Sequence, residues 1–98
     1  MSRAHEIATI RTDLAAGVPV DATEYARAKV AAVAKYSPAD IAFARVRLST
    51  DGPRSVVAHV SLDVNGTPVN AEASAGTYHE AVDLVHDRLQ HQLTSLGR

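Results

Sequence analysis

The chain has 98 residues, of which 46% are hydrophobic and 21% charged, so its size and composition fit one folded domain and exclude a disordered chain. It has no cysteine, which excludes disulfides, thiolate zinc sites and thiol nucleophiles. The net charge of −1 argues against a strongly nucleic-acid-binding protein, although residues 1–54 hold eight Lys and Arg against six acidic residues.

The sequence contains no candidate membrane span and no secretion signal. No apolar run approaches the roughly 18 residues that a transmembrane helix needs, and the first residues, MSRAHEIATIRTD, lack an apolar core. We therefore expect residues 1–98 to form a single cytoplasmic domain without a membrane partner.

The first two elements are predicted to be a strand and a helix. Residues 6–14 (EIATIRTDL) alternate loosely between apolar and polar positions, and AAGVP then turns the chain. A helix should start at Asp21, which would act as the N-cap with Glu24 in a capping box and Val20 as a hydrophobic staple. It should end near Tyr36, because Pro38 disfavours the helical conformation of the residue before it. The predicted core stripe is Ala22, Ala26, Val30 and Val33.

Three strands should follow as an antiparallel meander. Residues 41–49 would place Ala42, Ala44, Val46 and Leu48 on one face and Ile41, Phe43, Arg45 and Arg47 on the other. Residues 55–64 alternate more cleanly, with Val56, Ala58, Val60, Leu62 and Val64 inward. Asn65-Gly66 predicts a tight hairpin, because a type I′ turn needs positive φ at both positions. The last strand, residues 67–75, would turn Val69, Ala71, Ala73 and Ala75 inward.

The last predicted element is a helix that Thr77 caps, with Glu80 reciprocating. Its predicted core stripe is Tyr78, Val82, Val85, Leu89, Leu93 and Leu96. The fold is therefore expected to be α+β in the order β-α-β-β-β-α: one mainly antiparallel four-stranded sheet with two helices packed on one face, like a double-stranded-RNA-binding domain. The other sheet face would stay partly open to solvent.

The histidines do not form a predicted metal or catalytic site. His79 and His86 border the stripe of the last helix, whereas His91 should point to solvent with Glu80, Asp83 and Asp87. A zinc-binding H-E-x-x-H motif would need a histidine where Asp83 stands. His59 lies in the middle of a strand and His5 near the start of the chain. Since phosphate-binding glycine loops are also absent, we expect no metal, cofactor, catalytic residue or small-molecule substrate.

The first helix carries a basic and aromatic flank. Tyr25, Lys29 and Tyr36 project within about forty degrees of one another, with Arg27 and Lys35 on the remaining surface. Such a set can bind RNA phosphates and stack on bases. Alternatively, the tyrosines cover the edge of the core and the lysines keep the helix soluble, which the pattern alone favours.

Two arginines, Arg45 and Arg47, share a face of their strand and could extend a basic strip with Arg54 in the next turn. Charged residues on an open sheet face also protect against aggregation. The strand pattern leaves both interpretations open.

Three segments resemble the ribosome hibernation-promoting factor and protein Y family, also described as ribosome-associated inhibitors and sigma-54 modulation proteins. EYARAKVAAVAKY (residues 24–36) is similar to the family's first helix, AVDLVHDRLQHQL (81–93) to its last helix, and LDVNGTPVNAEASA (62–75) to its third and fourth strands. The resemblance covers about residues 6–93, and the predicted element order is the family's order.

This resemblance implies a non-catalytic protein that binds ribosomal RNA of the small subunit in the messenger and transfer-RNA channel. It would hold ribosomes inactive during starvation or stationary phase. By matching position, Lys29, Lys35 and Arg88 are the implied RNA-binding residues. Local chemistry alone adds Arg27, Arg45 and Arg47, with Tyr25 and Tyr36 as stacking rings.

The sequence departs from the family in ways that lower its positive charge. His79 stands where the family usually has tyrosine, His91 where a basic residue is frequent, and TSLGR (94–98) replaces a lysine-rich tail. We therefore expect weaker RNA binding than in basic relatives, and stronger binding in mildly acid solution if His91 contributes. The chain resembles the short form of the family or its N-terminal domain.

An alternative function is a protein-interaction or regulatory domain with weak or no RNA binding. The acidic second half and the solvent-side Leu84 favour it. Such a domain could self-associate through the open sheet face.

Overall fold

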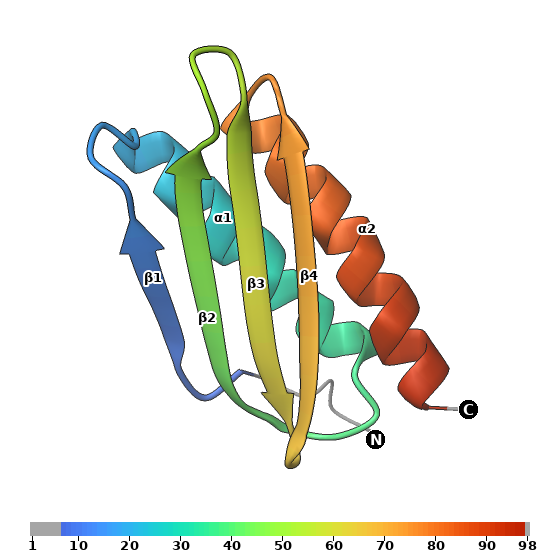
Figure 1. Cartoon of the computed structure of the whole chain (residues 1–98). Helices are drawn as coiled ribbons and strands as arrows, with labels where there is room; N and C mark the ends of the chain where they lie inside the picture. Colours follow the sequence, from blue (N-terminus) through green and yellow to red (C-terminus); the bar gives the residue numbers. More distant parts are fainter. Residues whose placement is uncertain (1–6, 98) are drawn as a thin grey trace.

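The computed structural model describes residues 7–97 and has the predicted α+β fold (Figure 1). Its elements are β1 (Ile10–Leu14), α1 (Val20–Ala32) with a 3₁₀ turn (Val33–Tyr36), β2 (Ile41–Thr50), β3 (Val56–Val64), β4 (Thr67–Ala75) and α2 (Tyr78–Leu96). The strands lie in the order β1-β2-β3-β4, with β1 parallel to β2 and the other pairs antiparallel. Both helices cover the same face of the sheet, which leaves the opposite face open (Figure 1).

Strand β1 is shorter than the sequence indicated. Its regular pairing runs from Ile10 opposite Ala44 to Leu14 opposite Leu48, and Ile7 adds only an isolated bridge to Ile41. Glu6, the first residue of the predicted strand, and His5 lie outside the described residues. The parallel pairing places β1 at the edge of the sheet, beside the arginine-bearing strand β2.

The start of α1 corrects the sequence prediction. Pro19, not Asp21, occupies the N-cap position, and no side chain among residues 7–97 caps the helix. Its φ of −66° and ψ of 151° lead directly into the helix, because proline's ring fixes φ near the helical value. Val20 is 74% exposed and forms no hydrophobic staple. Asp21 lies in the first turn, where its charge still interacts favourably with the helix dipole.

Strand β2 contains a bulge that changes which residue enters the core. Ile41 pairs with Val64 and Phe43 with Asp63, so three residues of β2 span two of β3. As a result Ile41 is fully buried and Ala42 is exposed, the reverse of the strict alternation predicted from the sequence. The bulge thereby buries the larger apolar side chain. From Ala44 onward the predicted faces are correct.

The hairpin between β3 and β4 forms as predicted. Asn65 and Gly66 both have positive φ, at 51° and 90°. The Asp63 carboxylate accepts a hydrogen bond of 2.8 Å from the Gly66 N–H, which fixes the turn. Most of the predicted inward residues are buried: Ala58, Val60, Leu62, Val64, Val69, Ala71 and Ala73; Val56 and Ala75 are half-buried.

Helix α2 closes the core. The Thr77 hydroxyl accepts a hydrogen bond of 3.1 Å from the Glu80 N–H, which confirms the predicted cap. Leu89 and Leu93 are fully buried against the sheet. Leu96, also predicted for the core, is 42% exposed, because it is the last residue of the helix and the sheet covers it only partly there.

Candidate nucleic-acid interface

The eight predicted RNA-binding residues fall into three separate places. Tyr25, Arg27, Lys29, Lys35 and Tyr36 lie on α1 and the 3₁₀ turn, Arg45 and Arg47 on the open face of β2, and Arg88 on α2. Because the helices pack on the opposite side of the sheet from the β2 arginines, these residues do not form one continuous site.

On α1, Tyr25 and Lys29 face α2. The Tyr25 hydroxyl donates a hydrogen bond to Asp83, and the Tyr25 ring lies 4.2 Å from the ring of His79, centroid to centroid. The Lys29 ammonium is 3.6 Å from the same Asp83 carboxylate. Asp83 was expected on the solvent side of its helix with His91, but its side chain reaches α1.

We define the helix seam as this row of contacts between the two helices. It consists of Tyr25, Lys29 and Tyr36 with His79, Asp83 and His86. The hydrogen bond to Asp83 and, second, partial burial raise the pKa of the Tyr25 hydroxyl. The seam therefore holds Tyr25 in its neutral, donating form.

At the other end of the seam, the Tyr36 and His86 rings meet edge to face at 6.1 Å. The His86 side chain is 13% exposed, and its Nδ1 lies 3.7 Å from the Asp87 carboxylate. The Lys35 ammonium sits 5.2 Å from the centroid of the Tyr36 ring, a cation–π arrangement on the outer surface. The rings of Tyr25 and Tyr36 are thus partly covered by histidine rings of α2. The side chains of Arg27 and Lys35, in contrast, are exposed.

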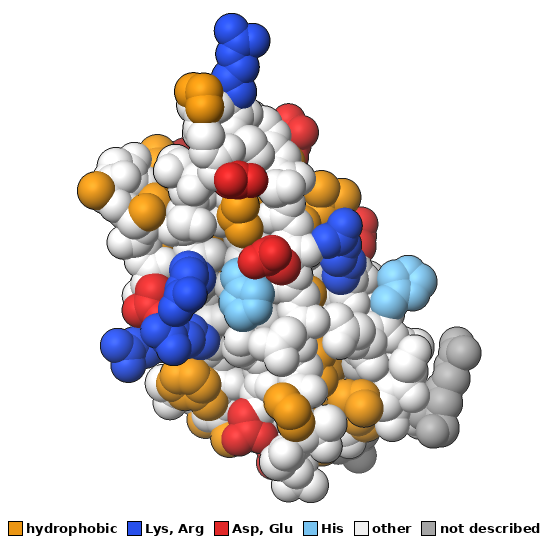
Figure 2. Space-filling view, in the orientation of Figure 1, with side chains coloured by type: hydrophobic (Ala, Val, Ile, Leu, Met, Phe, Trp, Pro, Cys, Tyr) orange, Lys and Arg blue, Asp and Glu red, His pale blue; other side chains and the backbone are white. Residues whose placement is uncertain are grey.

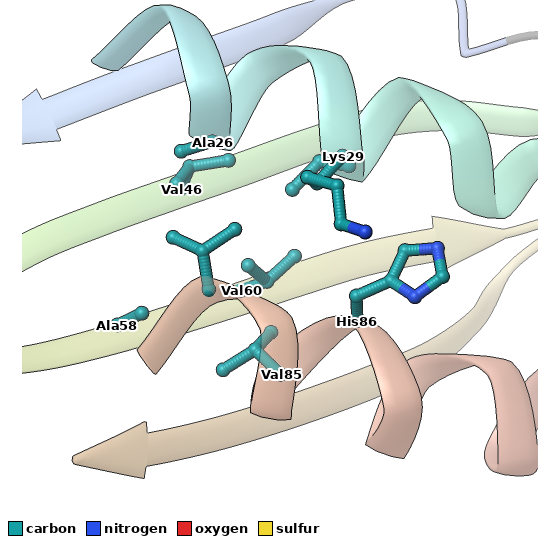
Figure 3. Close-up of a pocket in the computed structure, with 9 residues that line it drawn as sticks. Ala26, Lys29, Val46, Ala58, Val60, Val85 and His86 are labelled. Carbon is teal, nitrogen blue, oxygen red and sulfur yellow. The ribbon is translucent and has the colours of Figure 1, made fainter. Parts of the chain in front are cut away.

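A narrow gap lies beneath the seam, between the helices and the sheet (Figure 3). Lys29 and His86 point toward each other at its mouth, and its other labelled lining residues are alanines and valines (Figure 3). It is too tight to admit a water molecule. The space is therefore a packing gap and offers no pocket for a small ligand.

On the open sheet face, Arg45 and Arg47 are joined by Arg11, which pairs with Arg45 across strands β1 and β2. Arg45 donates to the Asp13 carboxylate, and the Arg11 Nε lies 3.6 Å from it. The hydrogen bond from Arg45 is the main cause that lowers the pKa of Asp13; burial opposes it, and the charges of Arg45, Arg11 and Arg47 add to the lowering. Figure 2, which views this face, shows one group of Lys and Arg side chains over β1 and β2 and separate ones elsewhere on the surface.

Sequence reasoning missed Arg11 and Asp13 because it did not establish which strand lies next to β2. The loose alternation of residues 6–14 assigned no face to Arg11 and Asp13, and only the parallel pairing of β1 with β2 brings them beside Arg45.

Arg88 lies at the free edge of the sheet. Its guanidinium donates a hydrogen bond to the backbone carbonyl of Glu72 in β4, and Gln92 donates one of 2.7 Å to the carbonyl of Asn70. These two side chains of α2 cover carbonyls at the outer edge of β4. Arg88 therefore has a structural partner and stands apart from Lys29 and Lys35.

Within residues 7–97, no three His or acidic side chains are grouped so that they could hold a metal ion. No helix in the same range is long and apolar enough to span a membrane.

Comparison with known proteins gives one family and a shared fold. The family model described as sigma 54 modulation protein / S30EA ribosomal protein matches residues 18–97. The Thermus thermophilus protein Y N-terminal domain superposes with a TM-score of 0.74 at 23% identity, covering 93% of this chain and 98% of that one. A ribosomal subunit interface protein from Coxiella burnetii gives 0.76 at 15% identity, covering 90% and 96%. These likenesses confirm the predicted fold. No curated protein sequence matches the chain.

Proposed function

The chain belongs to the sigma 54 modulation protein / S30EA ribosomal protein family, and on this basis we propose that it is a ribosome-associated translation inhibitor. Membership confirms the resemblance to hibernation-promoting factors and protein Y that the helix motifs indicated. In the proposed function the protein acts without catalysis in the cytoplasm. It binds small-subunit ribosomal RNA in the messenger and transfer-RNA channel and holds ribosomes inactive under stress.

The observation that carries the proposal is the family match over residues 18–97, which includes both helices. The two similar structures are those of a protein Y domain and a ribosomal subunit interface protein, and they cover 93% and 90% of this chain. A ribosome-binding role requires no metal, cofactor or small-molecule substrate, and we propose none.

The outer surface of α1 is the best-supported RNA contact. Arg27 and Lys35 are exposed there, and Lys35 lies over the Tyr36 ring, so phosphate binding and base stacking are available side by side. Lys29 can join them by exchanging Asp83 for a phosphate, since an exposed ion pair contributes only about 0–1 kcal/mol. Arg88 would contact RNA from the other border of α2.

The number of cations limits the expected affinity. If Lys29, Lys35 and Arg88 each neutralise one phosphate, the logarithm of the binding constant should fall with the logarithm of salt concentration with a slope of roughly −2 to −3. A relative with more basic residues would show a steeper slope and tighter binding.

Cosedimentation with ribosomes at low and moderate salt tests the proposal. Wild-type protein should comigrate at low salt and dissociate as salt rises, and the Lys29→Ala, Lys35→Ala and Arg88→Ala triple variant should lose comigration at both. Arg54→Ala, in the turn between β2 and β3, is the control and should behave as wild type. Absence of comigration at both salt concentrations, or comigration that the triple variant retains, would refute ribosome binding through these residues.

A second candidate function is a protein-interaction domain with weak RNA binding. Two observations favour it: Asp83 partly neutralises Lys29 in the helix seam, and Asp13 partly neutralises Arg11 and Arg45 on the sheet. A protein that forms a defined complex with itself and does not bind RNA in the same assay would support this candidate.

A further inference from the structure

The open sheet face carries all the charged side chains of the four strands. They are Arg11 and Asp13 of β1, Arg45 and Arg47 of β2, Asp63 of β3 and Glu72 of β4. The helix-facing positions of the strands are instead mostly buried and apolar. Figure 2 views this face, which neither α1 nor α2 covers.

These charges are divided between the two halves of the face. Strands β1 and β2 hold three arginines against one aspartate, a net charge of +2. Strands β3 and β4 hold two acids and no lysine or arginine, a net charge of −2 when His59 of β3 is left out of the count. In the register of the sheet, Arg47 lies opposite His59, which in turn lies opposite Glu72. The face therefore has a positive side and a negative side, and their boundary runs along the strands.

We propose that a second copy of this chain binds this face, giving a symmetric dimer. Two copies that meet face to face are related by a two-fold axis in the plane between their sheets. An axis parallel to the strands lays β1 and β2 of one copy over β4 and β3 of the other, so each positive half faces a negative half. An axis across the strands would place like charges together. Charge complementarity thus selects the first arrangement, with the strands of the two sheets nearly aligned.

The same charge division disfavours RNA on this face. Phosphates near Arg45 and Arg47 would extend across β3 and β4 toward Asp63 and Glu72, whose charges repel them. A second copy instead satisfies both halves at once.

The remaining features fit face-to-face rather than edge-to-edge association. At the free edge of β4, Arg88 and Gln92 already cover backbone carbonyls, which discourages addition of a strand there. On the open face, Phe43 is 38% exposed and Val57 is half-buried, so each copy contributes some apolar surface.

The size of the face predicts a weak dimer. Four strands spaced about 4.8 Å apart and up to about nine residues long cover roughly 500 Å². Two such faces bury about 1,000 Å² in total, the lower limit for a specific interface. The association should therefore be transient and sensitive to salt. It leaves the outer surface of α1 uncovered and does not depend on ribosome binding.

Sedimentation equilibrium of the whole chain, across the micromolar to millimolar range at low and high salt, tests the dimer. Wild-type protein should associate at low salt and dissociate at high salt. Arg47→Glu removes the net positive charge of one half, and Glu72→Lys removes the net negative charge of the other. Each variant alone should associate at least about tenfold more weakly than wild type.

An equimolar mixture of the two variants should recover association, because the intact negative half of Arg47→Glu then faces the intact positive half of Glu72→Lys. Arg27→Glu makes the same charge change on α1 and should leave association unchanged. Circular dichroism melting checks that all three variants fold.

The proposal is overturned if wild-type protein stays monomeric at low salt, if the mixture is as monomeric as each variant alone, or if Arg27→Glu weakens association as much as Arg47→Glu. It is also overturned if Arg47→Glu leaves the dimer intact but weakens binding to a uridine oligonucleotide, which would make this face an RNA-binding surface.

Discussion

The helix seam and the open sheet face use the same residue types in different arrangements. In the seam, the Asp83 carboxylate accepts a hydrogen bond from the Tyr25 hydroxyl and lies close to the Lys29 ammonium. The His79 ring packs against the Tyr25 ring beside them. On the sheet, one carboxylate, Asp13, lies beside Arg11 and Arg45 and links β1 to β2. Asp83 joins two helices through side chains, whereas Asp13 joins two strands that their backbone pairing already holds together, so its main effect is on the local charge. The seam should therefore govern how the helices present Lys35 to RNA, and the sheet should govern association.

The helix seam and the open sheet face belong to elements that pack on one hydrophobic core. Leu89→Ala should destabilise this core and therefore both surfaces. Leu89 is fully buried between α2 and the sheet, so its truncation should lower the free energy of unfolding by about 2–5 kcal/mol in urea denaturation. Leu84→Ala on the same helix, at a side chain that is 42% exposed, is the control and should change it by no more than about 0.5 kcal/mol. Similar losses for both variants would mean that Leu89 is not a core contact.

The two helices of the seam start differently, because a side chain caps α2 but not α1 among the described residues. Substitutions at Thr77 and Asp21 should therefore change the free energy of unfolding by different amounts. Thr77→Ala removes the hydroxyl that caps α2 and should cost about 0.5–2 kcal/mol of unfolding free energy. Asp21→Ala should cost less, because Asp21 does not cap α1 and contributes only through the helix dipole. Thermal melting measures both. A larger loss for Asp21→Ala would restore the capping box that the sequence suggested.

Features set by local chemistry were predicted correctly. Asn65-Gly66 turns the chain because both residues adopt positive φ, and Thr77 caps α2 because its hydroxyl reaches a nearby backbone N–H. The order of the elements followed from such signals and from apolar spacing. The capping box at Asp21 failed because Pro19 takes the N-cap position, and its restricted φ places the cap two residues earlier.

The candidate site was predicted less well because its contacts join distant parts of the sequence. Tyr25 and Asp83 are 58 residues apart, and Arg45 and Asp13 are 32 apart. Periodicity gives the face on which each side chain lies, but not the element that packs against that face. The bulge at Ile41 is similar, because its position depends on pairing with β3 and not on residues 41–49 alone.

The proposed division of labour between the two surfaces can be tested on RNA binding. Lys35→Ala should weaken ribosome binding several-fold and reduce the salt slope by about 0.7–0.9, as expected for one lost phosphate contact. Arg47→Ala should leave both quantities nearly unchanged, because Arg47 lies on the opposite face of the sheet. Filter binding at several salt concentrations measures both. Equal effects of the two variants would mean that RNA contacts both surfaces.

Titration of Tyr25 should test the hydrogen bond between Tyr25 and Asp83 in the helix seam. The hydrogen bond to Asp83 raises the pKa of Tyr25 above its usual value, so the fold stabilises the neutral ring. This contribution should be complete below about pH 10 and be lost as pH rises through the raised pKa. In Asp83→Asn the pKa should move back toward the usual value, as ultraviolet absorbance of tyrosinate would show; Tyr36→Phe and Tyr78→Phe help to assign the signal. An unchanged titration would place the Tyr25 hydroxyl outside the seam.

The smallest effect is expected for the carboxylate of the sheet. Arg45 and its neighbours lower the pKa of Asp13, so the fold stabilises the charged carboxylate. That contribution is present above the ordinary aspartate pKa, about pH 4, and is lost as pH falls through the lowered value. Asp13→Asn should therefore lose a little stability at neutral pH and show a flatter decline in acid, while Asp63→Asn serves as a control on the same face. Because the pair is exposed, both differences should be small, and urea midpoints from pH 2 to pH 7 would measure them. Parallel stability curves for wild type and Asp13→Asn would show that the arginines do not stabilise the Asp13 carboxylate in the folded state. The charge of Asp13 would then offset the arginine charges of the positive half less than the short distances between them imply.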